Sequence, residues 1–95
     1  MYEFEGPFQT VESLEDESGV YAVLCVYADK IDLVDVGQSS RVRTCVKNCE
    51  RKECWKQNCP GVLKYAIYYE GNGTEHLAFD VVKDVKANYY LICGG

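Results

Sequence analysis

Two short stretches, SGVYAV at residues 18–23 and LVDVGQS at residues 33–39, decide how this chain begins to fold. Each is an apolar run that begins or ends at turn residues, and the polar pair Asp29-Lys30 lies between them. This pattern predicts a β-hairpin, with one strand over residues 19–27 and a second over residues 31–36.

The hairpin is followed by signals for helix, strand and helix. The sequence Gly37-Gln38-Ser39-Ser40 predicts a strand-to-helix turn in which Ser39 or Ser40 is the helix N-cap. A helical segment is predicted over residues 41–57, in two pieces broken near residues 49–52. Residues 62–70 predict a third strand and residues 71–73 a turn. A final helix is predicted over residues 75–91, because apolar residues recur there at every fourth position: Leu77, Val81, Val85 and Tyr89.

Together these elements predict a single α+β domain over residues 1–95. Its centre is expected to be a small, mostly antiparallel three-stranded sheet flanked by helices. The final helix would cover one face of the sheet, and the segment 41–57 would cover the other. Residues 1–18 are interpreted as an acidic N-terminal arm, either a strand or an extended segment, with a turn at Gly6-Pro7.

Charge is unevenly distributed along the chain. The net charge of −5 argues against a nucleic-acid partner. Residues 1–18, however, hold six acidic residues and no basic one, whereas residues 41–57 hold six basic residues and only two acidic ones. Such a polarised molecule can meet a phosphate backbone on one face. The alternative interpretation is that the basic segment is an ordinary solvated helix face.

No apolar run is long enough to span a membrane, and no basic-then-apolar signal sequence opens the chain. These features predict a cytoplasmic protein that has no membrane partner and whose thiols are reduced.

Four of the six cysteines cluster in the basic segment, as Cys45, Cys49, Cys54 and Cys59. Structural zinc takes four converging ligands, so this cluster is a candidate zinc or thiol site. On a continuous helix Cys45 and Cys49 share a face while Cys54 points away, which favours ordinary half-buried thiols. Both interpretations stay open, and the other two cysteines, Cys25 and Cys93, are expected to be core thiols.

The order Gly-Val-Tyr at 19–21, then Asp-Val-Gly-Gln-Ser at 35–39, resembles the signature of the GIY-YIG nuclease superfamily. In that family two paired strands carry the two tripeptides. The resemblance implies that Tyr21 lies beside a scissile phosphate and helps to activate water. It also places Asp35 where a second tyrosine would stand and matches Gly37 to the turn glycine.

The resemblance implies an eroded site. The family places an arginine on the next helix and, in some small members, a histidine four residues later, but here Cys45 and Cys49 occupy those positions. Arg43 and Arg41 lie within one turn. The position of the metal-binding glutamate on the final helix falls on Val82, which Asp80 and Asp84 flank.

The candidate catalytic residues are therefore Tyr21, Asp35 and Arg43, and the metal ligands are unknown. Substrate contacts are predicted for the glycine turn and the basic segment, namely Gly37, Gln38, Ser39, Arg41, Lys47, Arg51, Lys52 and Trp55. Tyr21 and Trp55 also have a structural interpretation, Tyr21 as a core tyrosine and Trp55 as a cap on the core rather than a platform for a base.

Three hypotheses of function follow. The first is an inactive domain that binds nucleic acid, in particular DNA, or a protein through residues 41–57. The second is an active endonuclease that hydrolyses DNA phosphodiesters with Mg²⁺ or Mn²⁺, with Asp35, Asp80 or Asp84 in place of the missing glutamate. The third is a zinc or thiol protein that uses the four clustered cysteines.

Overall fold

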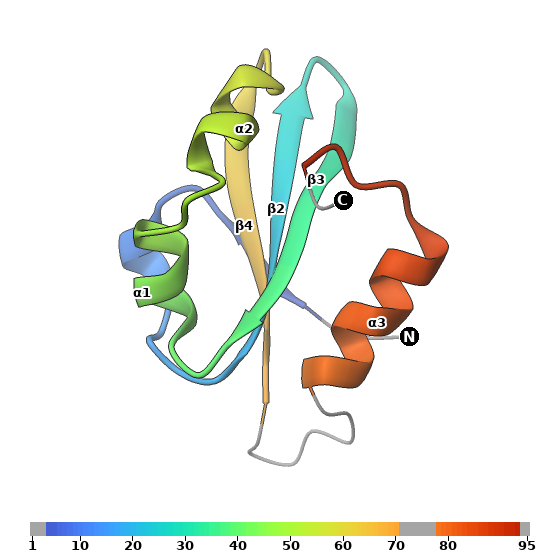
Figure 1. Cartoon of the computed structure of the whole chain (residues 1–95). Coiled ribbons are helices and arrows are strands. Elements are labelled where there is room, and N and C mark those ends of the chain that lie inside the picture. Colours follow the sequence, from blue (N-terminus) through green and yellow to red (C-terminus); the bar gives the residue numbers. More distant parts are fainter. Residues whose placement is uncertain (1–3, 71–77, 94–95) are drawn as a thin grey trace.

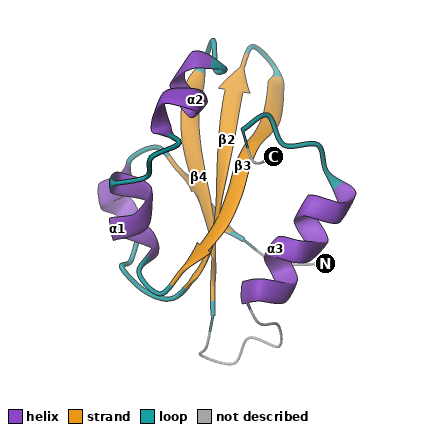
Figure 2. Ribbon diagram, in the orientation of Figure 1, coloured by secondary structure: helices purple, strands orange, loops and turns teal. Residues whose placement is uncertain are grey.

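Residues 4–70 and 78–93 are described by the computed structural model, and they form an antiparallel sheet with helices on both faces (Figure 1). The predicted α+β class is confirmed, and Figure 2 shows the strands gathered between the helices. The elements in chain order are β1 (Glu5–Phe8), the 3-10 turn η1 (Val11–Ser13), β2 (Gly19–Tyr27), β3 (Lys30–Ser39), α1 (Val42–Lys47), α2 (Lys52–Gln57), β4 (Val62–Tyr69) and α3 (Ala78–Asn88).

The sheet has four strands, in the order β1-β4-β2-β3, and the predicted number of three is wrong. The extra strand is β1, which lies in the acidic arm and pairs with β4 through Glu5↔Ile67 and Phe8↔Tyr65. Without β1, one side of β4 would leave its backbone groups unpaired. The sequence allows a strand in this arm, but it does not indicate that the strand joins the sheet, because β1 is only four residues long and contains the Gly6-Pro7 pair that predicts a turn.

The β2–β3 hairpin forms as predicted, but its turn comes one residue earlier than expected. Tyr27 pairs with Lys30, so Ala28 and Asp29 make the connection, and Ala28 takes a positive φ of 53°. Strand β3 also continues to Ser39. Gly37 therefore lies inside a strand rather than at a bend.

A β-bulge interrupts the regular pairing of this hairpin. Val23 pairs with Asp35 and Leu24 pairs with Leu33, which leaves Val34 as the extra residue in β3. Strict alternation would send Val34 and Asp35 to opposite faces of the sheet. Instead both lie on the face covered by α2, since Val34 belongs to the core cluster of Tyr21 and Trp55 and the Asp35 carboxylate accepts a hydrogen bond from Trp55.

Each face of the sheet has its own core, as the sequence predicts (Figure 1). Under α1 and α2 the main buried residues are Tyr21, Val23, Cys25, Val42, Val46, Trp55 and Ile67. Between the sheet and α3 they are Val20, Val36, Tyr68, Val81, Val82 and Leu91. Tyr21 and α3 therefore lie on opposite sides of the sheet.

Two disulfides join Cys25 to Cys59 and Cys54 to Cys93, where reduced thiols were expected. The partners are 34 and 39 residues apart, so local spacing gives no sign of them. With Cys54 and Cys59 in these bonds, the four-cysteine zinc site is not formed. The second disulfide also holds the C-terminal segment beside β3, where the Cys93 amide donates a 2.8 Å hydrogen bond to the Val34 carbonyl.

The predicted break in the segment 41–57 is confirmed, since α1 ends at Lys47 and α2 begins at Lys52. Neither Ser39 nor Ser40 is the N-cap of α1. Arg41 takes that position, and its backbone amide donates a 3.0 Å hydrogen bond to the Ser39 hydroxyl oxygen.

The final helix, α3, falls within the predicted span of 75–91 but ends at Asn88, three residues earlier. The predicted turn at 71–73 and the first residues of that span lie outside the described residues. Among the described helices, none is long and apolar enough to cross a membrane.

Candidate functional site

Tyr21 and Gly37 face each other across the β2–β3 pair, as the sequence predicts. A Cβ atom built on residue 37 would collide with the hydroxyl group and ring of Tyr21. Glycine is thus needed here because the tyrosine ring lies against the backbone of the neighbouring strand. The ring is 3% exposed, which fixes the position of its hydroxyl group.

Arg51 lies at the break between α1 and α2 and reaches back to the sheet. One terminal nitrogen of its guanidinium group donates to the Tyr21 hydroxyl oxygen at 3.3 Å, and its Nε lies 3.1 Å from Asp35 Oδ2. The Arg51 side chain is 40% exposed. A guanidinium group that is fixed on one side and open to solvent on the other is suited to contact an anion such as a phosphate.

Asp35 holds this arrangement together from inside the protein. Its carboxylate is fully buried, and Oδ2 accepts a 2.8 Å hydrogen bond from the Trp55 indole nitrogen as well as the contact with Arg51. Oδ1 accepts a 2.8 Å hydrogen bond from the Val36 amide. Because both oxygens are occupied and closed to water, Asp35 is a positioning residue in this structure, rather than the catalytic residue expected from the sequence.

Trp55 belongs to the core and is not a platform for a nucleic-acid base. Its side chain has no exposed surface, and its ring meets the Tyr21 ring edge-on, with the ring centres 6.5 Å apart. A buried indole needs a partner for its N–H group, and Asp35 provides one. The structural interpretation of Trp55 is thus confirmed.

The surroundings shift the pKa of both Tyr21 and Arg51 upward. Burial is the main cause for Tyr21, and the nearby Cys45 adds to it, so its pKa lies well above the usual 10. For Arg51, burial lowers the pKa, but the hydrogen bond to Tyr21 and the charge of Asp35 outweigh this effect and raise the pKa overall. The site therefore presents a neutral phenol beside a permanent cation.

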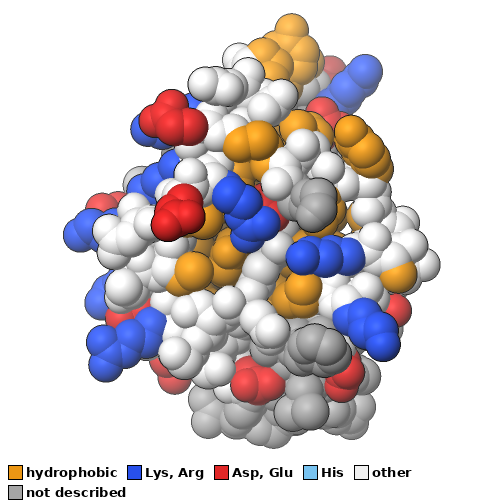
Figure 3. Space-filling view, viewed as in Figure 1, with side chains coloured by type: hydrophobic (Ala, Val, Ile, Leu, Met, Phe, Trp, Pro, Cys, Tyr) orange, Lys and Arg blue, Asp and Glu red, His pale blue; other side chains and the backbone are white. Residues whose placement is uncertain are grey.

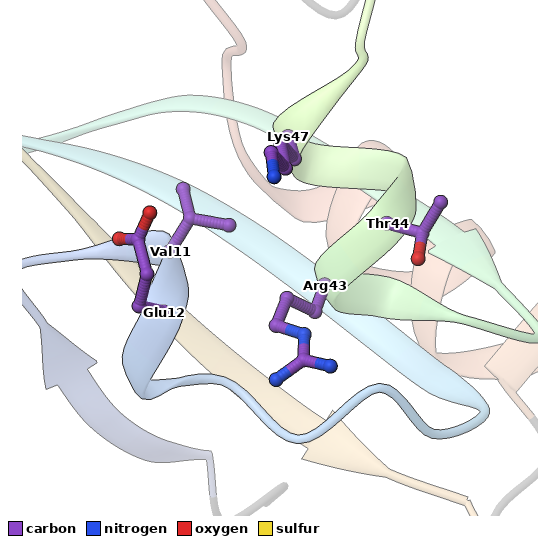
Figure 4. Close-up of a pocket in the computed structure, with 5 residues that line it drawn as sticks. All are labelled: Val11, Glu12, Arg43, Thr44 and Lys47. Carbon is purple, nitrogen blue, oxygen red and sulfur yellow. The ribbon is translucent and has the colours of Figure 1, made fainter.

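Arg43, the third candidate catalytic residue, contributes to a different feature. It lies on α1 and lines a groove of about 250 Å³ between α1 and η1 (Figure 4). Arg43 and Lys47 extend from α1 on one side of this groove, and Val11 and Glu12 face them from η1, with Thr44 completing the lining. In the structure it is Arg51, and not Arg43, that donates to Tyr21.

The acidic arm anchors the start of α1. The Thr44 amide donates to one oxygen of Asp16 at 2.9 Å, and the Thr44 hydroxyl donates to the other at 2.8 Å. The hydrogen bond from the Thr44 amide is the main reason why the pKa of Asp16 is lowered. Arg41, Arg43 and Lys47 remain exposed on the helix that this contact holds.

The other predicted substrate contacts lie around this region with different exposure. Gln38 is exposed, Ser39 and Lys52 are partly buried, and Gly37 is covered by Tyr21. Figure 3 shows Lys and Arg side chains along the side of the molecule that α1 and α2 form, with acidic side chains among them.

The residues expected near a metal lie far from this site. Val82 lies on the buried face of α3, across the sheet from Tyr21, and Asp80 and Asp84 are exposed on the same helix. Substitution of Asp80 or Asp84 for a missing metal ligand beside Tyr21 therefore has no geometric support. Within residues 4–70 and 78–93, no three His, Cys, Asp or Glu side chains converge as metal ligands.

The sequence pointed to Tyr21 and Gly37 but missed how Arg51 acts. Arg51 was expected to contact substrate from a helix face, and the helical break instead turns it toward Tyr21 and Asp35. The predicted break near residues 49–52 was the available signal, because a residue at the start of a new helix is free to point toward the sheet.

Comparisons with protein-family models, curated proteins and solved structures each found no match to this chain.

Replacing Asp35 by Ala should destabilise the fold strongly. The change leaves the Trp55 N–H group and the Arg51 guanidinium group without their buried acceptor. We expect the free energy of unfolding to fall by about 3 kcal/mol, the lower end of the range for broken buried ion pairs, because Arg51 is partly solvated. Urea unfolding measures this loss. Asp32→Ala, at an exposed position of the same strand, should change stability by less than about 0.5 kcal/mol, and an equal effect of both variants would contradict the role given to Asp35.

The raised pKa of Tyr21 predicts a loss of stability at high pH. In the unfolded chain tyrosine ionises near pH 10, whereas folded Tyr21 stays protonated. The contribution of Tyr21 to the free energy of unfolding is therefore complete below about pH 10. Above that pH it falls by about 1.4 kcal/mol per pH unit. Unfolding measured from pH 9 to 11 should show a steeper decline for the natural protein than for Tyr21→Phe. Parallel curves would show that Tyr21 ionises as easily in the folded protein as in the unfolded chain.

Proposed function

We propose that this protein is a GIY-YIG endonuclease-fold domain with eroded catalytic residues that binds nucleic acid through residues 41–57. The observation that carries the proposal is the solvent-open Arg51 guanidinium, fixed by Tyr21 and Asp35 on the same side of the sheet as the exposed cations of α1. Phosphate contacts made by Arg and Lys supply most of the affinity in sequence-independent nucleic-acid binding. The order of Tyr21 and Gly37 on two paired strands supports the kinship.

The groove beside α1 supports a phosphate contact there. Arg43 and Lys47 are four residues apart and line its same side (Figure 4). Side chains with this spacing lie next to each other on a helix, so the two charges act on one anion or on neighbouring phosphates. Glu12 on the opposite wall opposes anion binding within the groove. The phosphates are therefore expected along the outer surface of α1, with DNA as the main partner.

The salt dependence of DNA binding tests this proposal. Each phosphate contact on duplex DNA contributes about −0.9 to the slope of log K against log salt concentration. Replacing Arg41, Arg43 and Lys47 together by Ala should therefore make the slope shallower by roughly 2.7 and weaken binding to a labelled duplex, measured by fluorescence anisotropy.

A matched control removes three exposed cations elsewhere on the surface. Lys30, Lys83 and Lys86 lie outside residues 41–57, and their replacement by Ala changes the net charge by the same amount. In this control, the slope of log K against log salt concentration should differ from that of the natural protein by no more than about 0.9, the value of one phosphate contact. Equal effects of both triple variants would indicate only non-specific attraction. Salt-independent binding, or none, would remove the nucleic-acid proposal and leave a protein partner.

A second candidate function is an active Mg²⁺- or Mn²⁺-dependent endonuclease. It is favoured by the hydrogen bond between Tyr21 and Arg51, because a phenol beside a guanidinium group places a water-activating group next to a phosphate-binding one. The buried state of Asp35 and the position of α3 across the sheet weigh against it, since neither supplies an accessible metal ligand beside Tyr21.

A nicking assay on supercoiled plasmid distinguishes the binding domain from the active endonuclease. For an eroded domain we expect no nicking above background with either metal ion, and no difference between the natural protein and Tyr21→Phe. Nicking that needs the metal ion, stops in chelator and disappears in Tyr21→Phe would establish the enzyme instead.

The cytoplasmic location predicted from the sequence stays a prediction. Two disulfides are more typical of proteins in oxidising compartments and so count against it.

A further inference from the structure

Two thiols remain once the disulfides are assigned, and both pack against the core cluster under α1 and α2. Cys45 and Cys49 are both half-buried and unpaired. The backbone between them continues a helical turn, with the Asn48 amide bonded to the Thr44 carbonyl at 3.1 Å and the Cys49 amide to the Val46 carbonyl at 3.5 Å. On a regular helix, residues four apart have Cβ atoms about 5–6 Å apart on one face. Cys49 lies two residues past the end of α1, where its amide bonds three residues back and the turn is tighter than a regular helix.

Both thiols face the group formed by Tyr21 and Arg51. They pack against the core cluster that contains Tyr21 and Trp55, and each interacts electrostatically with the Tyr21 hydroxyl group. Cys49 also contributes to the raised pKa of Arg51, so the thiol and the guanidinium group influence each other. The proposed nucleic-acid contact uses neither sulfur, so this part of the site has no role in that function.

We infer that Cys45 and Cys49 form a two-coordinate site for a soft monovalent metal ion of the Cu(I) type. Thiolate sulfur selects such ions over harder ones. Zinc would need four ligands, and the described residues bring no third His, Cys, Asp or Glu to the two sulfurs. With metal–sulfur bonds near the roughly 2.3 Å of zinc–thiolate bonds, two sulfurs on opposite sides of the ion would be about 4.6 Å apart, which side chains on adjacent turns can reach.

The balance of charge fits the same ion. Two thiols give up two protons to solvent and bind one Cu(I), which leaves a complex with a single negative charge. Arg51 supplies a positive charge next to Cys49 and offsets that of the complex. Burial against Tyr21 and Trp55 shields the sulfurs on the core side.

The test is a competition for Cu(I) between the full chain, with its disulfides intact, and a coloured Cu(I) chelator. It is done without oxygen and with ascorbate rather than a thiol as reductant. The natural protein should hold one Cu(I) per chain. Cys45→Ser and Cys49→Ser should each lower the affinity at least 100-fold, and Arg51→Ala should lower it about 10-fold, as expected for a group that supports a ligand. Asn48→Ser, in the same turn, should have no effect.

Thiol labelling before the titration, followed by mass analysis, should find two reactive cysteines, at positions 45 and 49. Near-ultraviolet circular dichroism should show an unchanged Trp55 environment in each serine variant, so that a loss of metal is not a loss of fold. Retention of one Cu(I) by the double variant Cys45→Ser/Cys49→Ser would overturn the assignment. So would a disulfide between these two cysteines in the purified protein, or binding that appears only after the other four cysteines are reduced.

Discussion

The buried carboxylate of Asp35 connects the sheet to the helix that covers it. From β3 it accepts hydrogen bonds from its own strand and from Trp55, and it lies against the guanidinium group of Arg51. A carboxylate in the core is costly unless its oxygens find donors, and here both oxygens do. The position of α2, the orientation of Trp55 and the reach of Arg51 toward Tyr21 all depend on this one group.

The disulfides reinforce the same helix from two sides. Cys54 lies within α2 and Cys59 follows it, and their partners are Cys93 at the C-terminal end and Cys25 in β2. A helix of only six residues is unstable alone, so these covalent links and the burial of Trp55 supply what its length does not. The rigid α2 contrasts with α1, which has no disulfide and is held at its start by Asp16.

Local sequence was sufficient for strands β2, β3 and β4, for the helices and for one side of the site. The alternating apolar residues of 18–23 and 33–39 correctly predict the hairpin, and its observed register, which includes the bulge at Val34, brings Tyr21 opposite Gly37. The bulge at Val34, the pairing of β1 and both disulfides were not predictable in this way. Each depends on contacts between residues far apart in the chain, and the bulge alone changes which face Asp35 occupies. The contacts of Arg51 with Tyr21 and Asp35 were also not predictable. A helical break shows where the chain turns, but it does not show which side chain then meets a hydrogen-bond acceptor.

The contact between the C-terminal segment and β3 has a consequence for solubility. Strand β3 is the last in the sheet, and an unprotected outermost strand invites other chains to add to it and aggregate. The Cys93 amide donates a hydrogen bond to the Val34 carbonyl on that strand, and the disulfide to Cys54 holds Cys93 in this position. The Cys54–Cys93 disulfide thus stabilises α2 and also keeps part of the edge strand β3 covered. Reducing this bond should therefore favour precipitation of the protein as well as its unfolding.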